Sequence, residues 1–269
     1  RQVIVNIRND ILSRGGEFRF RTKLENICIQ NQKLRTVTLN GEEFPAEKAV
    51  LAVGNGATDT FSMLLEQPLV FETKPMAFGF RQEHLQKEID DARYRRLPDS
   101  IREILPPADY SFYTHLTPET CVYTFCMCPG GSVVNASSLP GRLTVNGMSR
   151  HARDGKNANA ALLVSYRPKT VQQALSLQKE LEERAFTIGN GRLPITRDLD
   201  KAKTLTGVSP TAMPNTCEAD FSRIFPREML HSLQNGARLF QKEVLHGATT
   251  VPPVYTAPET RRSSPLRIK

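Results

Sequence analysis

AEKAVLAVGNGATD, residues 46–59, is the stretch of sequence that decides the fold. Its apolar run, residues 46–53, ends in the turn Gly54-Asn55-Gly56, and the helix-like segment 61–65 follows. A short apolar run bounded by turn signals predicts a parallel strand buried on both faces, and glycines at its carboxyl end let a ligand approach the backbone. A plain strand-to-helix turn that needs small residues also fits, since Asp59 stands where the dinucleotide fingerprint has its third glycine.

The preceding residues predict a helix and a small β-meander. Residues 3–13 have the spacing of a short amphipathic helix closed by Gly15-Gly16, and residues 17–21 alternate like a half-exposed strand. Two further strands, 26–29 and 34–39, flank a polar turn, and Asn40-Gly41 offers a tight turn before the apolar run. We therefore predict a helix, a meander and a buried strand ending in glycine, in that order.

This order resembles the second half of the FAD-binding domain of two-dinucleotide-type flavoproteins, in which a meander precedes a strand of the form Ala-x-x-apolar-apolar-apolar-Ala-x-Gly. Residues 46–54 fit that form residue by residue. The resemblance continues through residues 78–84, 126–138, 145–149, 152–159 and 259–268. Together these segments are similar to the bacterial family of uncharacterised FAD-dependent (NAD/FAD-utilising) dehydrogenases.

The resemblance implies an α+β or α/β chain in three parts. Residues 1–69 would be a partial, Rossmann-like FAD-binding domain, residues 70–255 an inserted, β-rich mixed substrate domain, and residues 256–269 a return segment. The family's N-terminal glycine-rich fingerprint and its C-terminal flavin segment are not in this sequence. We therefore expect an internal fragment of an FAD-dependent oxidoreductase, inactive by itself and weak or lacking in FAD binding. The full-length parent would pass electrons from a donor such as NAD(P)H to an unknown substrate. A non-enzymatic binding or scaffold module derived from a flavoprotein is the alternative.

The segment Arg81-Gln82-Glu83-His84 combines a fixed cation, a carboxylate and an imidazole at the end of a predicted strand. Such a combination suits anchoring an anionic substrate and moving a proton, so Arg81 and His84 are the candidate catalytic residues. An exposed helix start over residues 83–95 explains the same residues without any chemistry.

Two thiols and a glycine turn follow one another in Cys126-Met127-Cys128-Pro129-Gly130-Gly131. Cysteines two apart on an extended strand lie about 6.6 Å apart, too far for an undistorted disulfide, and the histidines show no zinc-ligand spacing near them. We expect buried structural cysteines and no metal, with a redox relay of the two thiols as the alternative. The turn could instead direct the backbone N–H groups of Gly130 and Gly131 toward a flavin or substrate.

Arg262 and Ser263 stand where the resemblance has the chain returning to the flavin domain. A guanidinium and a hydroxyl at that position could line a pocket between the domains, and a surface crossover is the alternative. With Gly54, Asn55, Gly56, Gly130 and Gly131, they complete the predicted cofactor-binding set.

The rest of the chain predicts a mixed insert. A hairpin is expected from residues 111–114 and 122–128, and a central strand at residues 160–165. Thr170 and Gln173 have the spacing of a capping box, Pro226 begins a second helix, and residues 189–214 read as a loop.

Composition narrows the class of protein. The 269 residues are 39% hydrophobic and 24% charged, and no apolar run approaches the roughly 20 residues of a membrane span. The net charge of +8 is dispersed and no nucleic-acid motif accompanies it, so we expect a small-molecule substrate of anionic type, without a nucleic-acid or membrane partner. Five scattered cysteines favour a reducing, cytoplasmic location. The sequence leaves the oligomeric state open.

Overall fold

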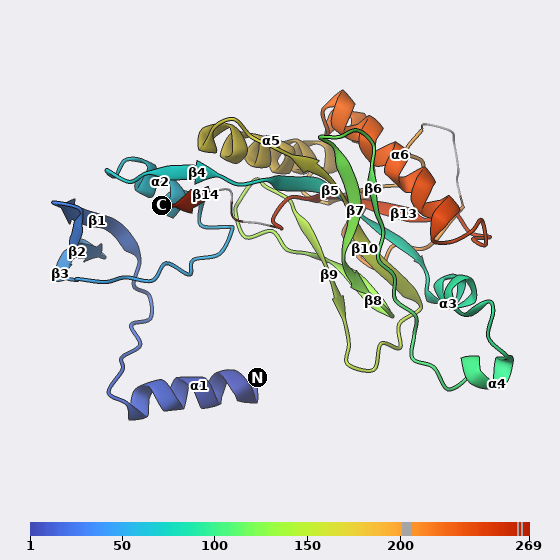
Figure 1. Ribbon diagram of the computed structural model, residues 1–269, viewed down its shortest axis with the longest axis horizontal. Helices are drawn as coiled ribbons and strands as arrows, with labels where there is room; N and C mark the ends of the chain where they lie inside the picture. Colours follow the sequence, from blue (N-terminus) through green and yellow to red (C-terminus); the bar gives the residue numbers. More distant parts are fainter. Residues whose placement is uncertain (201–205, 263, 265) are drawn as a thin grey trace. The chain divides into compact units, whose positions relative to one another are not determined.

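The computed structural model in Figure 1 describes residues 1–200, 206–262, 264 and 266–269. The chain divides into two compact units, residues 1–70 and residues 71–269. No helix in the described part of the chain is long and apolar enough to cross a membrane.

The first unit contains the predicted helix and meander. Helix α1 (Gln2–Ser13) is followed by an antiparallel sheet of three strands, β1 (Leu24–Gln30), β2 (Lys33–Leu39) and β3 (Glu42–Pro45), and then by helix α2 (Thr58–Leu65). The tight turn at Asn40-Gly41 has positive φ at both residues, 51° and 85°, as a hairpin of this kind requires. These predictions from local sequence are confirmed.

Two predicted strands of this unit are wrong. Residues 17–21 and 46–53 form no strand, and Val50 is 94% exposed. A parallel strand is stable only when neighbouring strands satisfy its backbone groups on both edges. The only sheet of residues 1–70 is the antiparallel meander, and its three strands pair only with one another. The apolar run therefore has no partner strand within its own unit.

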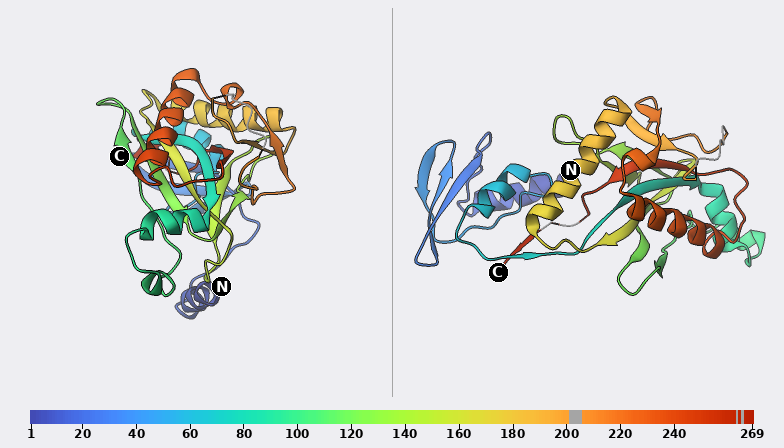
Figure 2. Two further views of the ribbon diagram at one scale, coloured as in Figure 1. Left: turned by 90° about the vertical axis from the view of Figure 1, so that its right-hand side faces the viewer. Right: turned by 90° about the horizontal axis from the view of Figure 1, so that it is seen from above.

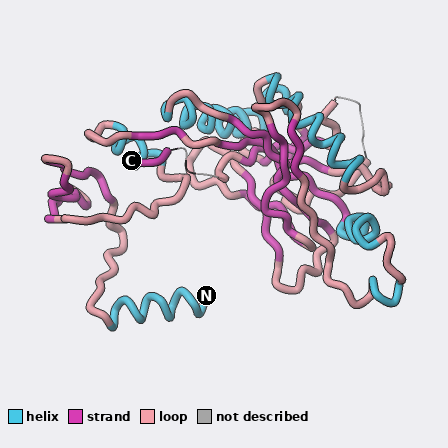
Figure 3. The backbone as a smooth tube through the Cα atoms, viewed as in Figure 1, coloured by secondary structure: helices cyan, strands magenta, loops and turns pink. Residues whose placement is uncertain are grey.

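The second unit is built on a seven-stranded sheet in the order β12-β11-β13-β5-β10-β7-β6. All described pairings are antiparallel except β11 with β12, which confirms a mixed α+β architecture. The strands, shown in magenta in Figure 3, are β5 (Met76–Leu85), β6 (Tyr113–His115), β7 (Cys121–Cys128), β10 (Asn157–Tyr166), β11 (Leu193–Thr196), β12 (Thr216–Glu218) and β13 (Val254–Glu259). Two smaller pairs complete the unit: β4 (Phe71–Thr73) with β14 (Leu266–Ile268), and β8 (Gly131–Asn135) with β9 (Val145–Ser149).

Two long helices cover this sheet. Helix α6 (Arg227–Glu243) packs against β10 and β7, and α5 (Val171–Gly189) packs against β11 and β13, as the two views of Figure 2 also show. The capping of α5 is confirmed, because the Thr170 hydroxyl accepts a hydrogen bond from the Gln173 N–H at 3.1 Å. Shorter helices lie at Gln86–Tyr94 (α3), Asp99–Arg102 (α4) and Phe221–Arg223 (η1).

Three local expectations change in this unit. The strand β5 continues through residues 83–85, so the helix expected from residue 83 begins only at Gln86. The predicted loop 189–214 contains the fully buried strand β11. The expected return segment also begins inside a strand, since residues 256–259 belong to β13, between β5 and β11 in the sheet.

The central strand β5 separates two different environments. The Phe80 ring packs against Phe221, Phe225 and Tyr255 in the main hydrophobic core, on the face that α6 covers. Successive side chains of a strand point to opposite faces, so Arg81 lies on the other face. We call this second face, opposite α6, the open face. The β8–β9 hairpin packs on part of it, and the candidate site lies on it.

Candidate functional site

Arg81 is held entirely by protein groups. Its side chain has no solvent exposure, and its Nε donates to Glu259 Oε2 at 2.6 Å. The terminal nitrogens donate to the second Glu259 oxygen, the Cys126 carbonyl, and the amide oxygens of Asn146 and Asn159, at 2.8–3.3 Å. All five N–H groups of the guanidinium are thus used. Arg81 therefore links its own strand, β5, to β7, β9, β10 and β13 on the open face.

The ion pair of Arg81 with Glu259 helps to hold the segment 259–262, which begins at the end of β13. Glu259 is bound to Arg81, and burial raises the pKa of the Glu259 carboxyl while the nearby guanidinium partly offsets that effect. The next two residues bind a fully buried carboxylate of α5: Thr260 donates to Glu182 at 2.7 Å, and Arg261 donates through Nε and a terminal nitrogen, both at 2.9 Å. Three successive side chains are therefore anchored immediately before Arg262.

Arg262 lies over two aromatic rings of β7. Its guanidinium carbon is 5.0 Å from the centre of the Tyr123 ring and 4.5 Å from that of Phe125. Val122 faces α6, where an added Cβ on Gly236 would come within 2.3 Å of it, so the alternate residues Tyr123 and Phe125 face the open side. Such cation–π contacts are strongest where water is excluded.

The sheet register aligns these residues with Arg81. Ala161 of β10 pairs with Arg81 on one side and with Phe125 on the other. Leu163 in the next such row pairs with Gly79 and Tyr123. Small and branched apolar residues therefore form a flat floor, with Arg81 buried at one edge and aromatic rings at the other.

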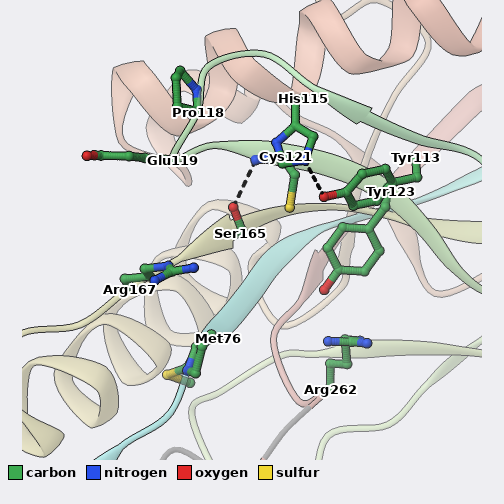
Figure 4. A pocket seen from close by; sticks show the side chains of 11 residues that line it. Met76, Tyr113, His115, Pro118, Glu119, Cys121, Tyr123, Ser165, Arg167 and Arg262 are labelled. Carbon is green, nitrogen blue, oxygen red and sulfur yellow. Dashed lines mark hydrogen bonds between the residues drawn. The ribbon is translucent and has the colours of Figure 1, made fainter.

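A pocket of about 400 Å³ opens beside this floor, toward the start of β5 and the end of β10 (Figure 4). The Tyr113 hydroxyl lies 2.7 Å from His115 Nε2, and the Ser165 hydroxyl accepts a hydrogen bond from the Cys121 N–H at 3.0 Å. The full lining comprises Pro75, Met76, Tyr113, His115, Pro118, Glu119, Cys121, Tyr123, Ser165, Arg167 and Arg262.

The pocket is positively charged. Arg167 and Arg262 contribute two guanidiniums, and Glu119 is the single carboxylate of its lining. Neither arginine makes an ion pair with a carboxylate of the described residues. The Arg262 guanidinium also acts on its neighbour: burial raises the pKa of Tyr123, and the cation partly offsets this rise.

His84 does not share a site with Arg81. Its side chain lies on the α6 face, where the ring packs 5.5 Å from Phe240 and its Nε2 lies 3.0 Å from Gln241 Nε2. Burial lowers the pKa of His84 from 6.5 to about 3, so the imidazole is neutral and accepts the amide hydrogen. Its Nδ1 makes no hydrogen bond with a described residue. The compact acid–base cluster expected from the sequence is therefore divided between two faces of the sheet.

The intervening Glu83 lies on the open face with Arg81 but has different partners. Its carboxylate accepts from the Thr211 hydroxyl at 2.7 Å and from Asn157 Nδ2 at 3.1 Å. Burial raises the pKa of Glu83, which these hydrogen bonds partly offset.

The two glycines of the 129–131 turn are required by close packing of backbones. An added Cβ on Gly130 would lie 1.9 Å from the Arg153 carbonyl oxygen, and one on Gly131 would lie 2.6 Å from the Met148 carbonyl oxygen. The Gly130 N–H donates to Gln86 Oε1 at 2.8 Å. A contact of this turn with a flavin stays a prediction, and the Gly130 N–H is already engaged within the protein.

The other predicted cofactor residues lie in different places. Gly54 has φ of 74°, and no atom lies within 4 Å of an added Cβ there. With Asn55 and Gly56 it forms the turn ahead of α2, in the first unit. Ser263 lies outside the described residues.

A β-bulge separates the two thiols of β7. Cys126 has φ of 48° at a register shift between β7 and β10. It is exposed, so the expectation of buried cysteines is wrong for Cys126 and is confirmed for Cys128, which is buried. Burial raises the pKa of the Cys128 thiol, and its sulfur lies 3.9 Å from an Arg81 nitrogen. The bulge directs the Cys126 carbonyl toward Arg81, so Cys126 contacts Arg81 through its backbone oxygen. In the described part of the chain, no three His, Cys, Asp or Glu residues gather as a metal site.

Most of the pocket was missed at the sequence level. Arg262 was predicted, whereas Tyr123 and Phe125 were assigned only to a strand. Their alternation with Val122 and Thr124 was the available signal, since two aromatic rings on one face of a strand indicate a surface for stacking. No local pattern singles out Arg167, which lines the same pocket as Arg262 because β10 and β13 both end beside β5.

Residues 75–262 match the family described as "FAD-dependent protein, C-terminal domain-like", and this match covers more than half of the chain. The chain belongs to that family. It is also similar to an uncharacterized protein of Clostridium beijerinckii, with 34% identity over 279 aligned residues that cover 99% of this chain. The chain spans about half (52%) of the length of that relative. The predicted link to an FAD-dependent family is thereby confirmed, whereas the fragment interpretation stays a prediction.

Proposed function

We propose that this chain supplies the substrate domain of an FAD-dependent oxidoreductase, with the pocket beside Arg262 as the place where the substrate meets the flavin ring. The observation that carries the proposal is the guanidinium of Arg262 laid over Tyr123 and Phe125. It lies on the open face of the domain that matches the FAD-dependent family. Bound FAD would supply the two-electron chemistry.

The residues of the open face fit a flat ring system. The rings of Tyr123 and Phe125 offer stacking surfaces, and Arg262 adds a fixed positive charge, while Ala161 and Leu163 lie fully buried in the apolar sheet beneath them. A cation beside a ring that gains electrons favours the negative charge that develops there. Arg262 is thus the residue that we expect to face the ring, with Arg81 and Glu182 holding its segment in place.

The dinucleotide part of FAD has a less complete match. The open backbone at Gly54, with Asn55 and Gly56 ahead of α2, suits an approach of phosphate oxygens to N–H groups. Residues 46–53, however, form no strand in front of that turn. We therefore propose that tight FAD binding requires sequence beyond this chain, and that the chain alone is catalytically silent. NAD(P)H as the electron donor and His84 as a proton carrier stay predictions.

The test is the visible absorption spectrum after incubation with FAD and removal of the free cofactor. Two proteins are compared: this chain, and this chain with whatever further sequence its gene encodes. We expect a retained flavin band in the longer protein only. The matched variants Arg262→Gln and Arg96→Gln each remove one exposed positive charge, and only the first should alter the band. Absence of flavin from both proteins would refute the proposal and favour the non-enzymatic binding module.

A further inference from the structure

Building on the proposed function, we infer that the substrate is an oxyanion, such as a carboxylate, attached to a flat apolar body, and that Arg167 and Arg262 together recognise its charge. The two residues belong to separate connections. Arg167 follows β10 directly, and Arg262 follows β13, yet both side chains line the same pocket (Figure 4).

The first observation is the excess of positive charge in the pocket. Several arginines of this unit are paired with carboxylates, among them Arg81 with Glu259, Arg261 with Glu182, and Arg197 with Glu218. Neither Arg167 nor Arg262 makes an ion pair with a described residue, and the Arg262 guanidinium lies over two aromatic rings. Two guanidiniums therefore face one pocket with Glu119 as the only carboxylate of its lining. A guanidinium prefers a planar, bidentate oxyanion over other partners.

The pocket also contains neutral hydrogen-bonding groups that can bind an anion. The Ser165 hydroxyl accepts from the Cys121 N–H, which leaves its own hydrogen free to donate. Tyr113 and His115 are hydrogen-bonded to each other through the tyrosine hydroxyl and His115 Nε2. The Ser165 hydroxyl thus adds a donor to those of the two guanidiniums, and an anion can accept from all three.

The pocket has room for an apolar group beside its charged groups. The apolar wall formed by Met76, Pro75 and the ring of Tyr123 adjoins the charged groups within a volume of about 400 Å³. A body of ring size fits this volume, which lies in the usual range for small-molecule sites. The combination selects a molecule with an apolar part and a charged end, and disfavours a free inorganic anion.

Arg262 is held ready for this role. Its chain neighbours Glu259, Thr260 and Arg261 are fixed by buried carboxylate contacts, as described above. Little backbone entropy then remains to be lost when an anion binds. Arg167 directly follows Tyr166, the last residue of the central strand β10.

The test measures binding of benzoate to the 269-residue chain by titration calorimetry, with benzamide as the neutral analogue of the same shape. We expect saturable benzoate binding that weakens as salt is raised, and at least about tenfold weaker binding of benzamide. Arg167→Gln and Arg262→Gln should each weaken benzoate binding by about tenfold, because each removes a charge-assisted hydrogen bond. Arg96→Gln removes an exposed arginine that is not part of the pocket lining, and should leave the affinity unchanged.

Several outcomes would overturn the inference. One is the lack of a saturable benzoate signal, and another is an equal loss in Arg96→Gln and in the two pocket variants. A third is arginine-dependent binding of riboflavin in place of benzoate, since the guanidiniums would then read the flavin ring. Failure here can be told from failure of the proposed function. Retained flavin without arginine-dependent benzoate binding refutes only the inference, and arginine-dependent benzoate binding without flavin refutes only the oxidoreductase.

Discussion

Acidification should weaken the core at His84 by an amount that the structure sets. Burial lowers the pKa of this imidazole from 6.5 in the unfolded chain to about 3 in the folded protein. Between these two values the unfolded chain binds more protons than the folded protein, so the free energy of unfolding falls as the pH drops. The contribution of the neutral His84 to the free energy of unfolding is complete above its unfolded pKa of 6.5, and it is lost progressively as the pH falls toward its folded pKa of about 3. One pKa unit corresponds to about 1.4 kcal/mol, so a change from about pH 7 to about pH 5 should cost about 2 kcal/mol from this group.

The perturbation that isolates this effect is His84→Gln. Glutamine keeps an acceptor for the Gln241 amide but carries no titrating group. Urea unfolding is followed by far-UV circular dichroism at both pH values, because the chain has no tryptophan. Glu83 and Glu259 have raised pKa values, so their contributions run in the opposite direction: they add stability as the pH falls through the folded values. Both proteins share these contributions, and the difference between them belongs to His84.

We expect the wild-type protein to lose about 2 kcal/mol more than His84→Gln over this pH change. Equal losses in the two proteins would refute the reasoning, since they would mean that the imidazole is solvated and titrates normally. A retained difference at high salt would strengthen it, because desolvation is not screened by ions.

Three further predictions concern stability, each measured by urea unfolding. Arg81→Met should cost about 3–5 kcal/mol because it leaves Glu259 buried without its cation, and the double variant with Glu259→Met should recover part of that loss; no recovery would contradict the ion pair as the cause. Thr170→Ala should cost about 1 kcal/mol through loss of the helix cap, and an unchanged midpoint would argue against the cap. Gly79→Ala should prevent stable folding, because its Cβ would lie 1.9 Å from the Leu162 carbonyl oxygen; normal solubility and unfolding would show that the strands can separate there.

Sequence reasoning succeeded where the cause of a structure is local. The cap at Thr170, the tight turn at Asn40 and the central strand at residues 160–165 follow from residues within a few positions of one another. The run 46–53 has the composition of a buried strand, but a strand also needs partners that no local pattern supplies. Local composition therefore predicts the tendency of a segment to form a strand more securely than it predicts the strands with which that segment pairs.

The candidate site shows the same division. The polar character of Arg81, Glu83 and His84 is evident in the sequence, and alternation along a strand would have placed Arg81 and His84 on different faces had β5 been extended to residue 85. The glycines at 130 and 131 were recognised, but their reason, contact with the backbone of residues 148–155, depends on distant packing. Arg167 became a candidate only through the sheet order.

The position of β13 has a consequence for biosynthesis. This strand comes from near the end of the chain but lies between β5 and β11, and its Glu259 pairs with Arg81 across 178 residues. Until the ribosome has released that segment, β5 has an unpaired edge and an arginine without its counter-ion. Contacts of such long sequence separation form slowly, and exposed strand edges invite association with other chains. We therefore expect the second unit to complete its folding only after residue 259 has left the ribosome, and nascent chains that stop before residue 254 to be targets for chaperones.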